Sequence, residues 1–211
     1  MEHEKLSHAH HYIHKYNNAS EMISTAIDFL KDGIGSNGTI MLITDQFSKD
    51  EIKNKMQENG IKDVKNKIKD EKIILHNTKK WYFPNDIWNT QRIISNLQKV
   101  VNDALEKKTT GLTIYGDTNG IFEHNHDDNL VEYENKLPKI FNMPFTAICG
   151  YNADLFSKLS SNQKQILQEH HFVPDKKDSN EITLCSCGAS YPITYKECPS
   201  CEQPTIHKWY T

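Results

Sequence analysis

The chain has 211 residues, of which a quarter are charged, and its formal net charge is −3 with neutral histidines. This length suits one domain of ordinary size with a small appendage. No apolar run approaches the roughly 20 residues that a membrane-spanning helix needs, and no basic stripe supports a nucleic-acid partner. The first residues are polar and rich in histidine, without the apolar core of a secretion signal, so we expect a cytoplasmic protein.

Apolar segments of strand length recur along the chain. The sequence predicts strands at residues 10–16, 39–45, 72–76, 111–117 and 144–151. Continuous apolar runs such as residues 39–45 are typical of strands that are buried on both faces of a parallel sheet.

Helical periodicity fills the segments between these strands. Residues 18–21 and 48–51 each combine a capping side chain with an acid three residues on, which predicts two helix starts. Asp86 is predicted to cap a long helix that has Ile87 on its buried face. A further helix should run from about residue 127 to residue 141 and either kink or restart at Pro138, and the last should span residues 160–171.

Repeated strand-then-helix units define the fold class. They predict an α/β fold with a doubly wound, mostly parallel sheet and helices on both of its faces. Residues 1–173 would form this domain. A polar, charged linker is predicted at residues 174–181, followed by a small module at residues 182–211.

Four of the five cysteines crowd into the small module, namely Cys185, Cys187, Cys198 and Cys201. Two thiolate pairs on two turns suit the tetrahedral coordination of Zn²⁺, and clustered cysteines without a secretion signal favour a metal over disulfides. The spacing resembles a zinc ribbon, although the first pair encloses a single residue where two are usual. Four occupied positions leave none for water, so the zinc would be structural. Disulfides, free thiols and iron are the alternatives.

The corner after the first predicted strand lacks a phosphate loop. That loop has the pattern Gly-x4-Gly-Lys-Ser/Thr, but residues 16–22 contain neither glycine nor lysine, and Glu21 brings negative charge to this corner. The strand at residues 111–117 resembles a Walker B strand, because apolar residues lead to Asp117. The layout therefore resembles a RecA- or KaiC-type ATPase with a degenerate phosphate loop.

Several short features follow one another in a fixed order along the chain. Tyr16 stands five residues after His11, residues 111–117 form a strand that ends in an acid, residues 130–134 place a Tyr-Glu pair on a helix, and residues 147–151 form the last apolar strand. Together these features resemble the MEDS family, a sensory domain of a dichloromethane-responsive repressor and of signalling proteins in methanogens and methylotrophs, in which His11 and Tyr16 match the opening histidine and the tyrosine five residues on. Two positions depart from the family. Ile13 stands where a cysteine is frequent, and Asp117 stands where glutamate is common.

The resemblance implies a non-enzymatic sensor of small molecules, with simple hydrocarbon derivatives among the proposed ligands. Open α/β sheets bind ligands at the carboxyl ends of their strands. Tyr16, Asp117 and Tyr151 are expected there, and with His11 they are the predicted ligand-binding residues. A protein partner would contact the zinc ribbon or an aromatic surface, which Tyr191, Tyr195, Trp209 and Tyr210 would form if they are exposed instead of filling the core of the small module. Residues 81–88 could form a lid over the cleft or a homodimer contact.

Other interpretations of these residues stay open. The domain could be a nucleotide-independent adaptor of the RecA/KaiC type that acts by protein contact, or a cryptic metal-dependent enzyme that uses His11 and Asp117. Glu134 is predicted to lie on a solvated helix face or to pair with a lysine such as Lys136 or Lys139, and Cys149 is predicted to be a small core residue.

Overall fold

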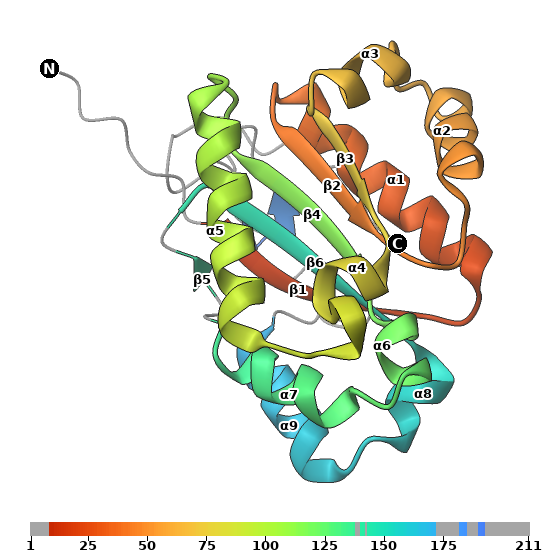
Figure 1. The fold of residues 1–211 in the computed structure, drawn as a ribbon, viewed down its shortest axis with the longest axis vertical. Coiled ribbons are helices and arrows are strands. Elements are labelled where there is room, and N and C mark those ends of the chain that lie inside the picture. The colour runs from red at the N-terminus through yellow and green to blue at the C-terminus, as the bar shows by residue number, and fades with distance from the viewer. Residues whose placement is uncertain (1–8, 138–139, 142, 172–181, 185–189, 193–211) are drawn as a thin grey trace, which may run out of the picture.

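A six-stranded sheet forms the centre of the computed structural model, which describes residues 9–137, 140–141, 143–171, 182–184 and 190–192. Its strands lie in the order β3 (Ile73–His76), β2 (Thr39–Ile43), β4 (Leu112–Asp117), β6 (Phe145–Asn152), β1 (Ala9–Tyr16) and β5 (Ile140–Phe141). The first five run parallel, and β5 pairs antiparallel with β1 at the edge (Figure 1). The predicted α/β fold with a mostly parallel sheet is confirmed, whereas the RecA-like assignment stays a prediction.

Three helices accompany one face of the sheet, namely α1 (Ala19–Gly35), α2 (Lys49–Glu58) and α3 (Val64–Lys69). The first two begin where the sequence predicts. The Asn18 side chain accepts a hydrogen bond from the amide of Glu21, and Ser48 and Glu51 form a capping box. The apolar face of α1 packs with Ile40 and Leu42 of β2 in a single buried cluster.

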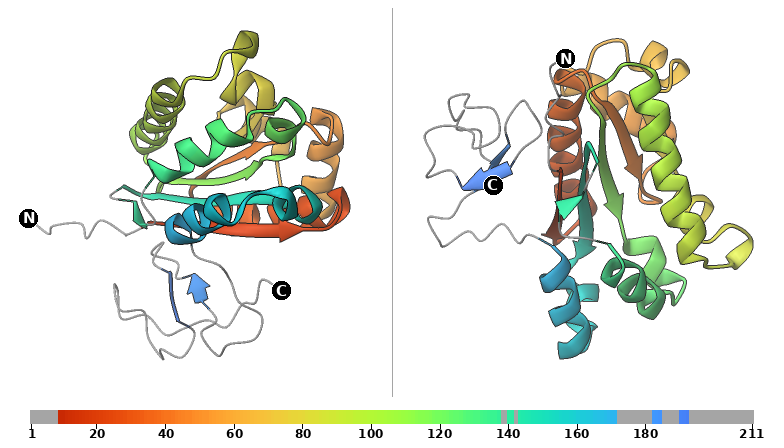
Figure 2. Two further views of the ribbon diagram at one scale, coloured as in Figure 1. Left: turned by 90° about the horizontal axis from the view of Figure 1, so that it is seen from below. Right: turned by 90° about the vertical axis from the view of Figure 1, so that its left-hand side faces the viewer.

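The remaining α-helices of the domain belong to the opposite face, and a 3-10 helix, η1 (Pro84–Asp86), lies between α4 and α5 in the sequence. These α-helices are α4 (Thr78–Tyr82), α5 (Thr90–Glu106), α6 (Asn119–Glu123), α7 (Asp127–Asn135), α8 (Ala153–Lys158) and α9 (Ser161–His170). The right-hand view of Figure 2 shows α1 and α5 on opposite sides of the strands. The core of this face includes Trp81, Tyr82 and Phe83, which are buried within the chain.

Two helix boundaries differ from the prediction. Asn89, not Asp86, caps α5, and Ile87 is 65% exposed because it precedes the helix instead of lying on its buried face. Helix α7 ends at Asn135, and residues 140–141 form strand β5 instead of continuing the helix. A proline at position 138 has no amide hydrogen to donate to the preceding turn, which explains why the helical pattern does not extend through it.

The described part of the C-terminal module is a two-stranded antiparallel sheet of β7 (Ile182–Leu184) and β8 (Ser190–Pro192). Cys185, Cys187, Cys198 and Cys201, as well as the predicted linker at residues 174–181, lie outside the described residues. The zinc ribbon therefore stays a prediction. Among the described helices, none has the length and apolar character that crossing a bilayer requires.

Candidate functional site

Two buried polar clusters lie on opposite faces of the sheet. The Asp117 network contains Tyr16, Thr44, Gln46 and Asp117. The Glu134 cluster contains His11, Glu134, Cys149 and His171. Side chains alternate between the two faces of a strand, so His11 and Tyr16, five positions apart on β1, must face opposite ways.

The Asp117 network joins three strands at their carboxyl ends. The Tyr16 hydroxyl donates to Asp117 Oδ1 at 2.6 Å, and the Thr44 hydroxyl donates to Oδ2 at 2.8 Å. Gln46 Nε2 lies 2.9 Å from both the Tyr16 hydroxyl and Asp117 Oδ2, and the amide of Asn119 donates to Oδ1 at 3.2 Å. Both carboxylate oxygens of Asp117 are therefore satisfied by neutral donors.

Burial changes the ionisation of this network. Desolvation raises the pKa of the Asp117 carboxyl, and the hydrogen bonds from Tyr16, Gln46 and Thr44 oppose that shift. Desolvation and the nearby Asp117 carboxylate also raise the pKa of the Tyr16 hydroxyl, which therefore stays protonated and acts as a donor.

The N-terminus of α1 is closed by the chain's own side chains. Glu21 Oε2 accepts from the backbone amide of Asn17 at 2.8 Å and from its side-chain amide at 3.0 Å. The Glu21 amide in turn donates to Asn18 Oδ1 at 3.0 Å. In a phosphate loop, amides at such a corner point at phosphate oxygens. Here both of these amides already have partners, and the Glu21 carboxylate carries the negative charge.

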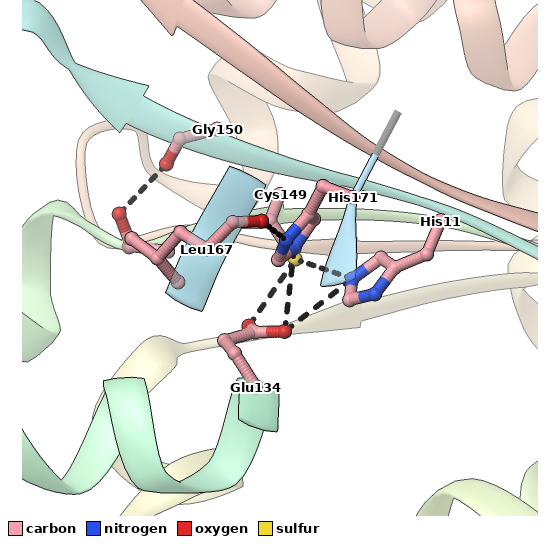
Figure 3. Close-up of polar contacts among 7 residues, drawn as sticks. His11, Glu134, Cys149, Gly150, Leu167 and His171 are labelled. Atoms are coloured by element: carbon pink, nitrogen blue, oxygen red, sulfur yellow. Dashed lines mark hydrogen bonds and ion pairs between the residues drawn. The ribbon is translucent and has the colours of Figure 1, made fainter. Parts of the chain in front are cut away.

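The Glu134 cluster gathers side chains from four separate segments. His11 is on β1, Glu134 on α7 and Cys149 on β6, while His171 directly follows α9. Figure 3 shows Glu134 reaching from its helix toward Cys149 and His11, with His171 beside Cys149. All four side chains are buried.

Four contacts within this cluster lie between 3.2 and 3.5 Å. His11 Nε2 lies 3.2 Å from Cys149 Sγ and 3.5 Å from Glu134 Oε2. His171 Nε2 lies 3.4 Å from Glu134 Oε2, and Cys149 Sγ lies 3.5 Å from Glu134 Oε1. The four potential ligand atoms lie within 4.8 Å of one another, so these residues could hold a metal ion.

Other atoms fix the state of individual groups in the cluster. His171 Nδ1 lies 2.7 Å from the carbonyl oxygen of Leu167, which can only accept, so this nitrogen carries a proton. Burial and the neighbouring Glu134 carboxylate raise the pKa of the Cys149 thiol. Without a cation nearby, the thiol is therefore protonated.

The predicted ligand-binding residues do not form one group. Tyr16 and Asp117 meet in the Asp117 network, whereas His11 lies in the Glu134 cluster. Tyr151 is on the same face as His11, with its ring edge-on to Phe156 at 5.5 Å between centroids. Its hydroxyl is buried and has no hydrogen-bond partner among the described residues.

Sequence reasoning missed part of the Glu134 cluster. The prediction that Glu134 lies on a solvated face is wrong, because this side chain is 1% exposed. A signal existed, since Glu134 is four residues after the buried Leu130 and three before the buried Leu137. Cys149 is buried as predicted, but no pattern pointed to its polar neighbours, and His171 had no signal beyond its residue type.

Comparison with known proteins identifies the family. No curated protein matches the chain. The family model described as "MEthanogen/methylotroph, DcmR Sensory domain" matches residues 10–171, which is well over half of the sequence. This span includes both polar clusters and every helix from α1 to α9. The chain therefore belongs to the MEDS family of sensory domains.

Proposed function

We propose that this protein is a non-enzymatic sensor in which the MEDS domain binds a small organic molecule. The observation that carries this proposal is the match of residues 10–171 to a family of sensory domains. The family supplies the class of function, and the structure supplies the physical arguments that narrow the kind of ligand.

The corner at α1 argues against a nucleotide as that ligand. The Glu21 carboxylate occupies the amide of Asn17, and Asn18 occupies the amide of Glu21. A triphosphate approaching this corner would meet a negative charge in place of the free amides and lysine of a phosphate loop. This supports a small uncharged or weakly polar ligand.

Tyr151 offers the ligand a contact on the face that also holds His11. Its phenol ring is packed edge-on against Phe122 and Phe156, and its buried hydroxyl has no hydrogen-bond partner among the described residues. An unpaired buried hydroxyl costs roughly 1–3 kcal/mol, which a ligand acceptor could recover. An apolar molecule with one polar atom would suit this environment. Tyr16 and Asp117 would then support the carboxyl edge of the sheet on the other face.

The output of the sensor is assigned to the C-terminal module. We propose that Cys185, Cys187, Cys198 and Cys201 hold a structural zinc ion and that the module contacts a protein partner. This arrangement would separate ligand binding in residues 10–171 from signal transmission. Elemental analysis of the intact chain, compared with a chain carrying Cys198→Ser, tests the zinc by the loss of about one equivalent in the variant. Equal zinc contents would contradict a zinc ion in the module.

Thermal-shift measurements test the sensor itself. Short-chain alcohols, amines and halogenated hydrocarbons should include at least one compound that raises the unfolding temperature. The Tyr151→Phe variant, which removes only the hydroxyl, should weaken that shift. The matched control is Tyr133→Phe, another buried tyrosine on the same face. Stabilisation by Mg-ATP instead would overturn the proposal, and an absence of any shift would favour a protein-contact adaptor.

A further inference from the structure

We propose that the Glu134 cluster binds a divalent transition-metal ion of the zinc type in tetrahedral coordination. The ligands would be His11 Nε2, one carboxylate oxygen of Glu134, Cys149 Sγ and His171 Nε2. This site is separate from the cysteines of the C-terminal module. It also goes beyond the proposed sensing of an organic molecule, because either could exist without the other.

Interatomic distances favour a shared ion over direct hydrogen bonds. Metal–ligand bonds of about 2.0–2.3 Å place the corners of a tetrahedron about 3.2–3.8 Å apart. Four separations in the cluster run from 3.2 to 3.5 Å; three lie within the set that has Glu134 Oε2 as the oxygen ligand, and the fourth joins Cys149 Sγ to Glu134 Oε1. The whole set of ligand atoms lies within 4.8 Å, a limit wider than the edge of a regular tetrahedron. A charge-assisted bond between an imidazole and a carboxylate would instead be about 2.7–2.9 Å long. Both imidazole–carboxylate distances, 3.4 and 3.5 Å, exceed that value by roughly 0.6 Å.

The orientation of His171 points to the same conclusion. Its Nδ1 donates a proton to the Leu167 carbonyl oxygen, so in the neutral ring the lone pair of Nε2 faces Glu134 Oε2. Neither Nε2 of His171 nor Oε2 of Glu134 has a hydrogen-bond partner among the described residues. Two lone pairs that face each other in a buried site repel, unless a cation lies between them. A backbone carbonyl that orients the distal nitrogen is also the usual support for a histidine that binds a metal.

Charge balance is complete with a divalent ion. For Glu134, the ion pairs recorded within the described part of the chain involve only His11 and His171, not a lysine or arginine. On metal binding, Cys149 releases its thiol proton to solvent and coordinates as the thiolate. One carboxylate and one thiolate then offset the two positive charges of the ion, so the buried site is neutral overall.

The types of donor atom define the class of metal. Imidazole and thiolate donors suit zinc and its first-row neighbours, whereas Mg²⁺ and Ca²⁺ prefer sites made only of oxygen. Four protein ligands complete a tetrahedron and leave no position for a water molecule. The ion would therefore hold β1, β6, α7 and the end of α9 together instead of activating a nucleophile.

Cobalt binding by the full chain tests the proposal. The four substitutions Cys185→Ser, Cys187→Ser, Cys198→Ser and Cys201→Ser together give a serine background in which Cys149 is the only thiol left of the five cysteines. After removal of metal, Co²⁺ should produce the visible bands of tetrahedral cobalt and a thiolate charge-transfer band. Both should saturate at about one ion per chain and disappear on addition of Zn²⁺. Cobalt held by histidines elsewhere in the chain would lack the thiolate band.

Variants in this serine background assign the ligands. Cys149→Ser should abolish the charge-transfer band, and Glu134→Gln and His171→Ala should each weaken cobalt binding by at least about tenfold. His14→Ala is the matched control, since His14 lies on β1 but on the other face, beside Tyr115. Circular dichroism identifies any variant that fails to fold, and the conservative Cys149→Ser and Glu134→Gln changes keep the test decisive. A folded chain without a thiolate band, or one whose band survives in Cys149→Ser, would overturn the proposal.

Discussion

Asp117 and Glu134 are both fully buried carboxylates, but their surroundings differ in kind. Asp117 accepts hydrogen bonds from two hydroxyls, a side-chain amide and a backbone amide. Glu134 faces two imidazoles and a thiol at distances of 3.4–3.5 Å. Each environment has to offset the cost of removing a carboxylate from water.

This difference shows how two equally buried acids can be distinguished by geometry. Short bonds from neutral donors mean that the Asp117 network is complete without a further atom. Longer separations among potential metal ligands mean that the Glu134 cluster gains most from a cation. The degree of burial alone would rank the two carboxylates as equivalent, because both are at most 1% exposed.

Metal removal should produce the largest change in stability. It should act through the Glu134 cluster and not through the Asp117 network. In the serine background, zinc at about 1,000 times its dissociation constant should raise the unfolding temperature of the metal-free chain by about 10 °C. Scanning calorimetry with and without zinc measures this shift. The shift should vanish in His11→Ala and persist in Asp117→Asn. An equal shift in His11→Ala would mean that the ion binds elsewhere.

Truncation of Asp117 should destabilise the domain whether or not metal is present. Asp117→Ala leaves the hydroxyls of Tyr16 and Thr44 and the amide of Gln46 without their acceptor, at a cost of about 2–4 kcal/mol. Urea unfolding gives the change in free energy. Asp50→Ala, which removes an exposed carboxylate on α2, should change it little. A loss that depends on zinc would contradict the separation of the two clusters.

The Asp117 network should also make stability depend on pH. Burial raises the folded-state pKa of Asp117, so its protonated form favours the folded chain. Its contribution is complete below the unfolded pKa of about 3.9, and it is lost as the pH rises through the higher folded pKa. The asparagine side chain of the Asp117→Asn variant cannot ionise, so this variant should lose the pH-dependent contribution of position 117 to stability. Urea unfolding from about pH 4 to about pH 7 should give a flatter profile for the variant, and identical profiles would contradict the assignment.

Removal of Gln46 should have the smallest effect. Its side chain is only partly buried, and water can replace some of its hydrogen bonds to Tyr16 and Asp117. Gln46→Ala should therefore cost about 1 kcal/mol in urea unfolding. The exposed Gln165, changed to alanine as a control, should show no comparable loss. A cost as large as that of Asp117→Ala would mean that Gln46, not the hydroxyls, satisfies the carboxylate.

The order of strands and helices could be predicted because it depends on local patterns. Apolar runs located the parallel strands, and capping residues located the starts of α1 and α2. The position of Tyr16 and Asp117 at strand ends also anticipated their contact. The predicted helix boundaries are wrong near Asp86 and Pro138. At both places one local sequence signal favours a helix and another opposes it.

The composition of the Glu134 cluster depends on tertiary packing and was harder to predict. Alternation along β1 already separates His11 from Tyr16, although the sequence prediction groups His11 with Tyr16, Asp117 and Tyr151 as ligand-binding residues. The cysteine that the family frequently has at position 13 is isoleucine here, and Ile13 lies in register with Cys149 on β6. A thiol is thus present beside His11, but on the neighbouring strand. Only the docking of α9 brings His171 to this place.

The distribution of the Glu134 cluster along the sequence has a consequence for how the domain folds. His11 and Cys149 are 138 positions apart, and His171 is the last residue of the family match. Contacts between such distant positions form only after a large loss of chain entropy, and they slow folding relative to local contacts. During synthesis, the first strand must therefore wait for nearly the whole domain to emerge before its histidine can meet its neighbours.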